Sequence, residues 1–123
     1  MKVFIADDSL EIRKRIIAML SDIERIDLIG QAENVQDAIS SIHELSPDVV
    51  ILDIRMPGGS GIDVLKTIEK KNRIPVVIML TNYPRSQYGN KCLDAGADFF
   101  FEKSIEFEKV MEVVTSMSGK GVN

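Results

Sequence analysis

Acidic residues, a hydroxyl and a lysine follow the short apolar runs of the sequence, at Asp7, Asp8, Asp53, Thr81 and Lys103. Carboxylates that are held close together repel each other, and a hard cation with oxygen ligands offsets this repulsion. A carboxylate can also attack phosphorus and form an acyl phosphate, while a metal ion and a lysine neutralise charge on the phosphoryl oxygens. If they converge, these residue types predict a metal-assisted phosphoryl-transfer site.

Apolar runs that alternate with helically spaced segments predict how these side chains are held. Three of the runs are nearly continuous, which is typical of strands buried on both faces. Strand–helix alternation favours an α/β fold with a mostly parallel sheet, in which ligands bind beyond the carboxyl ends of the strands. The predicted strands are Val3–Ala6, Leu28–Ile29, Val49–Leu52, Val76–Leu80 and Phe99–Phe101.

Local signals place the helices between these strands. Asp8, Asn34 and Ser60 are predicted N-caps, because each is followed three residues later by an acidic residue. The fourth helix, at about residues 85–95, is only weakly amphipathic, and Gly96 lies where it should end.

Composition limits the classes of protein that the chain can belong to. A length of 123 residues predicts one domain, for which we expect residues 1–118, followed by a disordered polar tail at residues 119–123. A formal charge of −4 argues against direct nucleic-acid binding. The apolar runs are too short to span a membrane, no signal peptide is evident, and Cys92 is the single cysteine, so we expect a cytoplasmic location.

The segments Asp7-Asp8, Asp53-Ile-Arg-Met-Pro-Gly58 and Ala95-Gly-Ala-Asp98 occur together with Thr81 and Lys103. In this combination they resemble the receiver domain of bacterial two-component response regulators over nearly the whole chain. The resemblance implies a flavodoxin-like (βα)₅ fold with a doubly wound, five-stranded parallel sheet of order 2-1-3-4-5.

The resemblance also implies a role for each acidic residue of the motif. Asp53 matches the phosphoacceptor. Asp8, Asp53 and the backbone carbonyl of Arg55 match direct ligands of Mg²⁺ or Mn²⁺, and Asp7 matches an acid that holds the metal through water.

The remaining motif residues match those that respond to the phosphoryl group. Thr81 matches the hydroxyl that bonds a phosphoryl oxygen, and Lys103 matches the lysine that pairs with the group. Phe100 matches an aromatic switch residue that turns inward on activation, although its apolar neighbours also allow an ordinary core position.

Four side chains near the motif depart from the family pattern or are bulky. Asn82 replaces a small residue, and with Arg55 and Tyr83 it is expected to flank the site and slow autodephosphorylation. Ser104 replaces the usual cis proline, so we expect a trans Lys103–Ser104 bond and an N-cap at Ser104. The segment 57–61 is glycine-rich but lacks a P-loop ending, and we expect a flexible loop.

The resemblance therefore implies a switch that catalyses only its own phosphorylation and dephosphorylation. A histidine kinase, a phosphotransfer protein or a small acyl phosphate would supply the phosphoryl group. The added charge would shift the surface of the fourth helix, fifth strand and fifth helix and so control binding of a downstream protein. The kinase, the output, a homodimer, and a stand-alone chain or a fragment of a longer DNA-binding regulator all stay open.

Three other functions are alternatives for a chain with these residues. A pseudo-receiver that binds partners without phosphorylation would not need the full set of acids, Thr81 and Lys103. An Asp-nucleophile phosphatase of the haloacid-dehalogenase type often has a second Asp at the position of Arg55. A flavin-binding module is disfavoured because acidic Asp7-Asp8 at the first turn would repel the flavin phosphate. His43 is the one histidine of the chain, so it offers no histidine cluster for a metal site.

Overall fold

A parallel five-stranded sheet forms the centre of the protein, whose structure is a computed structural model that describes residues 1–120. Its strands are β1 (Lys2–Ala6), β2 (Asp27–Ala32), β3 (Val49–Leu52), β6 (Val76–Thr81) and β7 (Phe99–Glu102). They are arranged in the order β2-β1-β3-β6-β7. Because β4 (Arg55–Met56) and β5 (Gly59–Ser60) form a separate hairpin, this order is the predicted 2-1-3-4-5, and the predicted fold is confirmed.

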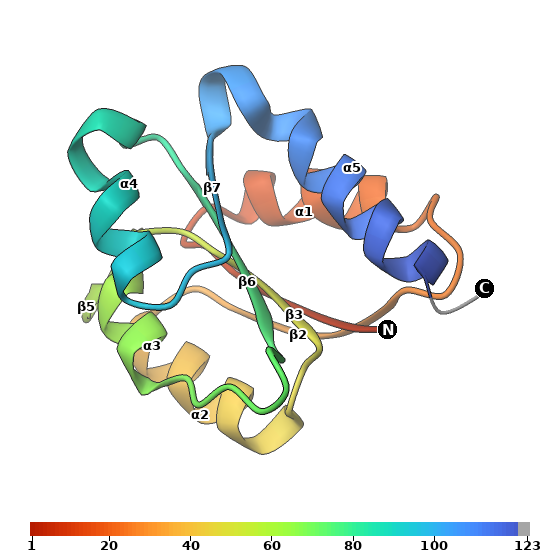
Figure 1. The fold of residues 1–123 in the computed structure, drawn as a ribbon, viewed down its shortest axis with the longest axis horizontal. Helices are drawn as coiled ribbons and strands as arrows, with labels where there is room; N and C mark the ends of the chain where they lie inside the picture. Colours follow the sequence, from red (N-terminus) through yellow and green to blue (C-terminus); the bar gives the residue numbers. More distant parts are fainter. Residues whose placement is uncertain (121–123) are drawn as a thin grey trace.

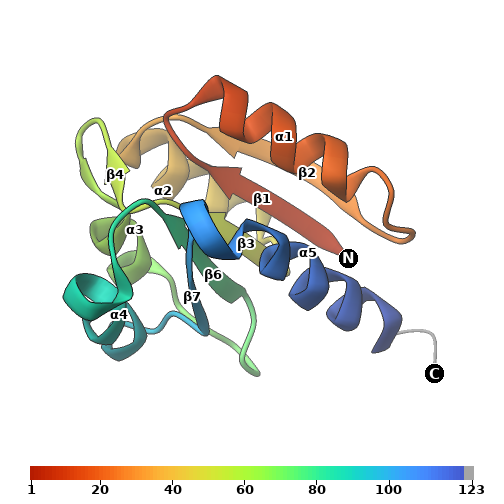
Figure 2. The ribbon, with the colours of Figure 1, turned by 90° about the horizontal axis from the view of Figure 1, so that it is seen from above.

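Five helices cover the two faces of this sheet (Figures 1 and 2). Helices α1 (Leu10–Leu20) and α5 (Lys103–Lys120) lie on one face. Helices α2 (Val35–Leu45), α3 (Gly61–Thr67) and α4 (Arg85–Asp94) lie on the other. The fold therefore has three layers. Among residues 1–120, no helix is long and apolar enough to cross a membrane.

The core is divided by the sheet into two apolar clusters. Alternate side chains of each strand enter opposite clusters: Phe4 of β1 packs towards α2 and α3, whereas Val3 and Ile5 pack towards α1 and α5. All three side chains are fully buried. This two-sided burial explains why the strands read as continuous apolar runs rather than as alternating patterns.

Two of the four predicted helix N-caps are confirmed. The Asn34 side chain accepts the N–H of Asp37, and Ser60 forms a capping box with Asp63. The predicted cap at Asp8 is wrong, because α1 begins one residue later and its cap is Ser9. Since Ser9 takes the capping role, the Asp8 side chain stays exposed at the sheet edge.

Helix α5 differs from its prediction at both ends. It begins at Lys103, so Ser104 lies inside the helix and is not its N-cap. Ile74–Pro75 is the single cis bond of residues 1–120, so the Lys103–Ser104 bond is trans as predicted. Residues 119 and 120 are helical rather than part of a tail, and the rest of the predicted tail lies outside the described residues.

Helix α4 contributes the fewest buried apolar side chains to the core among the longer helices, as its weakly amphipathic sequence predicts. Within it, only Gly89 and Cys92 are buried, and its N-cap residue, Pro84, offers no side-chain hydrogen bond. The helix ends before Gly96, whose φ of +112° lies in the region that favours glycine.

Candidate phosphoacceptor and metal site

The three aspartates of the motif converge at the carboxyl edge of the sheet. Strands β1 and β3 are parallel neighbours with Ala6 opposite Leu52, so the residues that follow them, Asp7 and Asp53, emerge side by side. The backbone N–H of Asp53 also donates to the carbonyl of Ala6 at 3.0 Å. Carboxylate oxygens of Asp7, Asp8 and Asp53 all lie within 4.8 Å of one another.

Lys103 joins the two buried members of this acidic cluster. Its Nζ lies 2.7 Å from Oδ2 of Asp7 and 2.8 Å from Oδ2 of Asp53, and its side chain is only 8% exposed. The other oxygen of Asp53, Oδ1, accepts the backbone N–H of Ile54 at 2.7 Å. Both oxygens of the predicted acceptor are therefore held in fixed directions.

The electrostatics of the cluster are set by burial and by this shared lysine. Burial raises the pKa of Asp7, although hydrogen bonds from Lys103 and from the Ser9 N–H oppose the rise. Burial alone would lower the pKa of Lys103, but its hydrogen bonds to Asp53 and Asp7 outweigh that effect and raise it. Lys103 is therefore held as a cation between the two carboxylates.

The residues present fit a small divalent cation. Three ionised carboxylates and one ammonium leave a formal charge of −3 + 1 = −2, which one Mg²⁺ or Mn²⁺ would balance. Hard oxygen donors are what these ions prefer. Asp7 and Asp53 are buried but Asp8 is exposed, so an ion can approach the cluster from solvent. Arg55 begins β4 (Arg55–Met56), and the role of its carbonyl stays a prediction.

Thr81 lies on the opposite side of the acceptor from β1. It ends β6 and pairs in register with Glu102, the residue before Lys103, so the sheet brings Thr81 and Lys103 to the same edge. Its side chain is buried, and Oγ1 accepts the N–H of Tyr83 at 3.4 Å.

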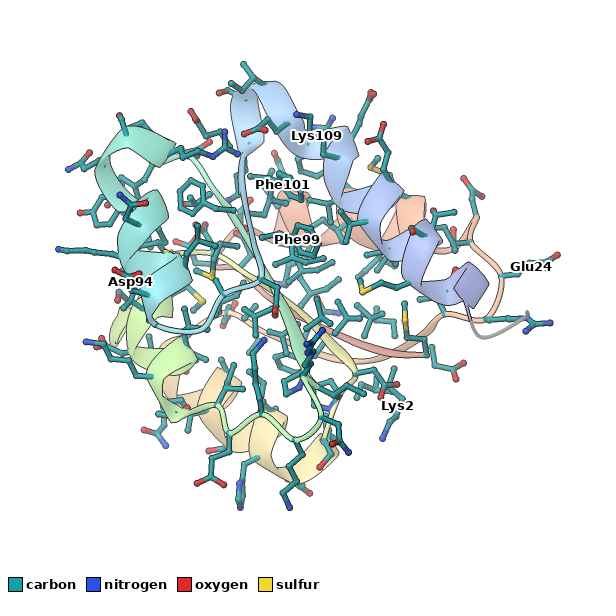
Figure 3. All side chains as sticks on the ribbon, in the orientation of Figure 1. Lys2, Glu24, Asp94, Phe99, Phe101 and Lys109 are labelled. Carbon is teal, nitrogen blue, oxygen red and sulfur yellow. The ribbon has the colours of Figure 1, made fainter. Side chains whose placement is uncertain are left out.

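Phe100 does not join the charged cluster. It is buried in the apolar cluster on the α4 side of the sheet, and the Arg85 guanidinium lies 5.9 Å from the centre of its ring. Phe99 and Phe101 stack on each other on the face towards α5 (Figure 3). Because side chains alternate along β7, Phe100 points to the α4 side of the sheet. Its role as a switch stays a prediction.

The predicted flanking residues are spread around the mouth of the site. Asn82, Arg55 and Ser104 are exposed, whereas Tyr83 is half-buried against Tyr88. Their predicted effect on the lifetime of the phosphoryl group stays a prediction.

The glycine-rich segment after Asp53 is a short hairpin. Strand β5 (Gly59–Ser60) pairs antiparallel with β4, whereas the sequence predicts a flexible loop at residues 57–61. A Cβ on Gly61 would lie 1.9 Å from the carbonyl oxygen of Asp53, so no other residue fits there. This close approach ties the start of α3 to the backbone of the acceptor.

Arg13 supports the acidic cluster from behind and was missed at the sequence level. Its guanidinium is buried, donating to the Asp7 carbonyl at 2.5 Å and to Oε1 of Gln31 at 2.8 Å. It thereby connects the ends of β1 and β2. A signal for its burial was present, because Arg13 is spaced three residues before Ile16 and seven before Leu20 on the buried face of α1.

A second buried charged residue, Glu106 of α5, was also missed. It accepts from the Arg85 guanidinium at 2.8 Å, from the N–H of Glu102 at 3.2 Å and from Lys109 at 3.2 Å. Arg85 also donates to the carbonyl of Phe100 at 2.6 Å. This group connects α4, β7 and α5, and no local sequence pattern indicates it.

Comparison with known proteins identifies the family. A family model described as the response regulator receiver domain matches residues 3–115. The chain therefore belongs to the receiver domains of response regulators, as the motif residues predicted.

The most similar relatives include proteins longer than this chain. It is 34% identical over 119 residues to protein-glutamate methylesterase/protein-glutamine glutaminase of Halalkalibacterium halodurans, a match that covers 92% of the chain and 34% of that protein. It is 34% identical over 122 residues to YvfU of Bacillus subtilis, named as an uncharacterized transcriptional regulatory protein, with coverage of 98% and 61%. The chain thus spans about one third to three fifths of these relatives.

Solved structures agree with this assignment. The CheX–CheY–BeF₃–Mg²⁺ complex of Borrelia burgdorferi contains a chain that is 30% identical with a TM-score of 0.82, covering 95% of this chain and 88% of that one. The response regulator domain of Thermotoga maritima CheB is 28% identical with a TM-score of 0.81, covering 98% and 94%.

Proposed function

We propose that the protein is a phosphorylation-dependent signalling switch whose acceptor is Asp53. The observation that carries this proposal is the placement of the Asp53 carboxylate between Lys103 and the two acids Asp7 and Asp8. A lone buried aspartate paired with a lysine would be an ordinary ion pair. The two further carboxylates make the cluster short of positive charge, which suits the arrival of a metal ion and a phosphoryl group.

The proposed reaction is an in-line displacement at phosphorus. An oxygen of Asp53 forms a bond to phosphorus as the bond to the donor's leaving group breaks, and an acyl phosphate results. A bound Mg²⁺ would neutralise negative charge on the phosphoryl oxygens. Lys103 is already 2.8 Å from the Asp53 carboxylate, so a short movement would transfer its ammonium to a phosphoryl oxygen. Asp8 and Asp53, with the Arg55 carbonyl and water on Asp7, would hold the metal.

The conformational response is proposed to start at Thr81. Its hydroxyl lies at the end of β6 and, within residues 1–120, accepts only a long hydrogen bond from Tyr83, so it is available to bond a phosphoryl oxygen. A shift of the loop after Thr81 would pull on α4, the helix with the least apolar anchoring. Phe100 lies in the apolar cluster that α4 covers, and Arg85, the first residue of α4, pairs with Glu106 of α5. Both contacts would change with that helix.

The phosphoryl donor and the downstream target are proposed from the family to which the chain belongs. We propose a histidine kinase or a phosphotransfer protein as the donor. Two relatives combine a matching region with further length, one named as a methylesterase and one as a transcriptional regulatory protein. A downstream domain or partner protein that contacts the α4–β7–α5 surface is therefore the proposed output.

Phosphorylation can be tested with a small donor. The protein is incubated with acetyl phosphate and Mg²⁺, and its intact mass is measured. We expect an added phosphoryl mass in the wild type and none in Asp53→Asn, which keeps the shape of the side chain but not its nucleophilic charge. No adduct in the wild type would favour a pseudo-receiver, and an adduct that persists in Asp53→Asn would place the acceptor elsewhere.

A further inference from the structure

A cavity of about 620 Å³ lies between α3 and α4, beside the phosphoacceptor site. The two helices are neighbours in both ribbon views (Figures 1 and 2). The β4–β5 hairpin closes one side of the cavity, through Arg55, Gly59 and Ser60. This volume falls within the range of pockets that take small organic ligands.

Two tyrosines form an aromatic surface in this cavity. The ring centres of Tyr83 and Tyr88 are 4.7 Å apart with an interplanar angle of 48°, and both side chains are half-buried. Ile54 and Ile62 add apolar lining next to them. Because the two rings are tilted, each offers its own apolar face to a ligand ring, at little cost in side-chain entropy.

Positive charge gathers around this aromatic surface. Arg55, Lys66 and Lys91 line the cavity, and Asp94 is the one acidic residue of the lining. None of the three cations forms an ion pair within residues 1–120. The Nζ of Lys91 lies 5.7 Å from the centre of the Tyr88 ring. Because the chain as a whole carries −4, this local excess of cations is not a general property of its surface.

We propose that the α3–α4 pocket, defined by Tyr83, Tyr88, Lys66, Lys91 and Arg55, binds a small aromatic anion. The flat ring of the ligand would contact the tyrosines, and its carboxylate, phosphate or sulfonate would lie between the cations. The phosphoacceptor site cannot take such a ligand in the same way, because it is acidic. Binding in the pocket requires no phosphorylation of Asp53, so it stands or fails separately from the proposed switch.

The probe for this site is 1-anilinonaphthalene-8-sulfonate, an aromatic sulfonate whose emission rises on binding. It is titrated into the wild type and into the double variant Lys66→Gln/Lys91→Gln. Since each exposed charge contributes modestly, we expect the dissociation constant to rise about fivefold in the double variant. A Tyr88→Leu variant, which keeps apolar volume but removes the flat ring, is expected to weaken binding as well.

Two matched controls separate this pocket from general adhesion. The double variant Lys14→Gln/Lys71→Gln removes the same charge from α1 and from a second cavity near α2, and it should bind the probe as the wild type does. N-phenyl-1-naphthylamine has the same rings without the sulfonate and should bind about fivefold more weakly. Equal loss in both double variants, equal affinity for the two probes, or no saturable binding would each overturn the proposal.

Discussion

Two groups of charges, one around Lys103 and one around Glu106 of α5, differ in how completely their charges are paired. In the first group, within residues 1–120, Lys103 is the one cation that forms ion pairs with the cluster of Asp7, Asp8 and Asp53. In the second, a single acid, Glu106, receives two cationic side chains and a backbone N–H. The first group is therefore short of positive charge, whereas the second is fully satisfied.

The pKa values of the two acids shift in opposite directions. Burial raises the pKa of Asp7 despite the nearby lysine. Burial also acts to raise the pKa of Glu106, but hydrogen bonds from Arg85, the Glu102 N–H and Lys109 outweigh it and lower the pKa. The contrast suggests that incomplete pairing marks the site that awaits a ligand, and complete pairing marks a structural connection.

The largest expected effect comes from removing the cation of the unsatisfied group. In Lys103→Gln, phosphoryl incorporation from acetyl phosphate should slow about a hundredfold, because a preorganised charge is lost at the phosphoryl oxygens. Mg²⁺ should nevertheless bind roughly fivefold more tightly, because a positive charge has left the acidic cluster. Intact mass over time and isothermal titration calorimetry measure the two quantities.

The control for this change is Lys109→Gln on the satisfied group. It removes the same charge from α5 but should leave Mg²⁺ affinity as in the wild type. Weaker Mg²⁺ binding in Lys103→Gln would contradict the view that the acidic cluster is short of positive charge.

The next largest expected effect is on stability, and it concerns Arg13, which lies behind the acidic cluster. Arg13→Met leaves the buried carbonyl of Asp7 without its donor, which should lower the free energy of unfolding by about 1–3 kcal/mol. Urea denaturation measures the loss. Lys14→Met, on the exposed side of α1, is the matched control and should change stability by less than about 0.5 kcal/mol. If Arg13→Met matches that control, Arg13 does not support Asp7.

A smaller effect is expected when the satisfied group is broken. Glu106→Gln should lower the free energy of unfolding by about 1–2 kcal/mol at pH 7, without slowing phosphoryl incorporation at Asp53. The folded-state pKa of Glu106 lies below its ordinary value of 4.5, so the stabilisation is present above about pH 4.5. It is lost as the pH falls through the folded-state pKa. Urea curves of the two proteins should therefore converge at low pH, and a constant gap would refute the assignment.

The smallest change tests a residue at the rim of the first group. Asn82→Ala should speed loss of the phosphoryl group a few-fold, because a smaller side chain lets water approach the acyl phosphate. It should leave stability within about 0.5 kcal/mol of the wild type, since Asn82 is exposed. Phosphate release from the isolated phosphoprotein gives the rate. An unchanged or slower rate in the variant would exclude Asn82 as a barrier to water.

The parts of the site that depend on strand ends were predictable from the sequence. Asp7 and Asp53 each follow a continuous apolar run, and parallel strands place such residues together whatever the details of packing. The same reasoning brought Lys103 to the correct edge. The order of the strands came from the family resemblance, because an alternation of strands and helices does not define it.

The parts that depend on contacts between distant residues were not predictable. Arg85 and Glu106 meet across 21 positions of sequence, and no spacing rule connects them. The predicted cap at Ser104 is wrong because α5 begins one residue before it, where the Glu106 carboxylate accepts the Glu102 N–H at the entry to the helix. The mistaken cap at Asp8 has a simpler cause, since Ser9 is an equally good capping residue one position later.

The aromatic pair in the α3–α4 pocket has a practical consequence for spectroscopy. The chain contains no tryptophan, and its two tyrosines are Tyr83 and Tyr88. All of its tyrosine emission therefore originates beside the loop whose backbone contacts Thr81. The unlabelled protein carries a local optical reporter, and a change in its tyrosine emission describes the surroundings of α4 rather than an average over the whole fold.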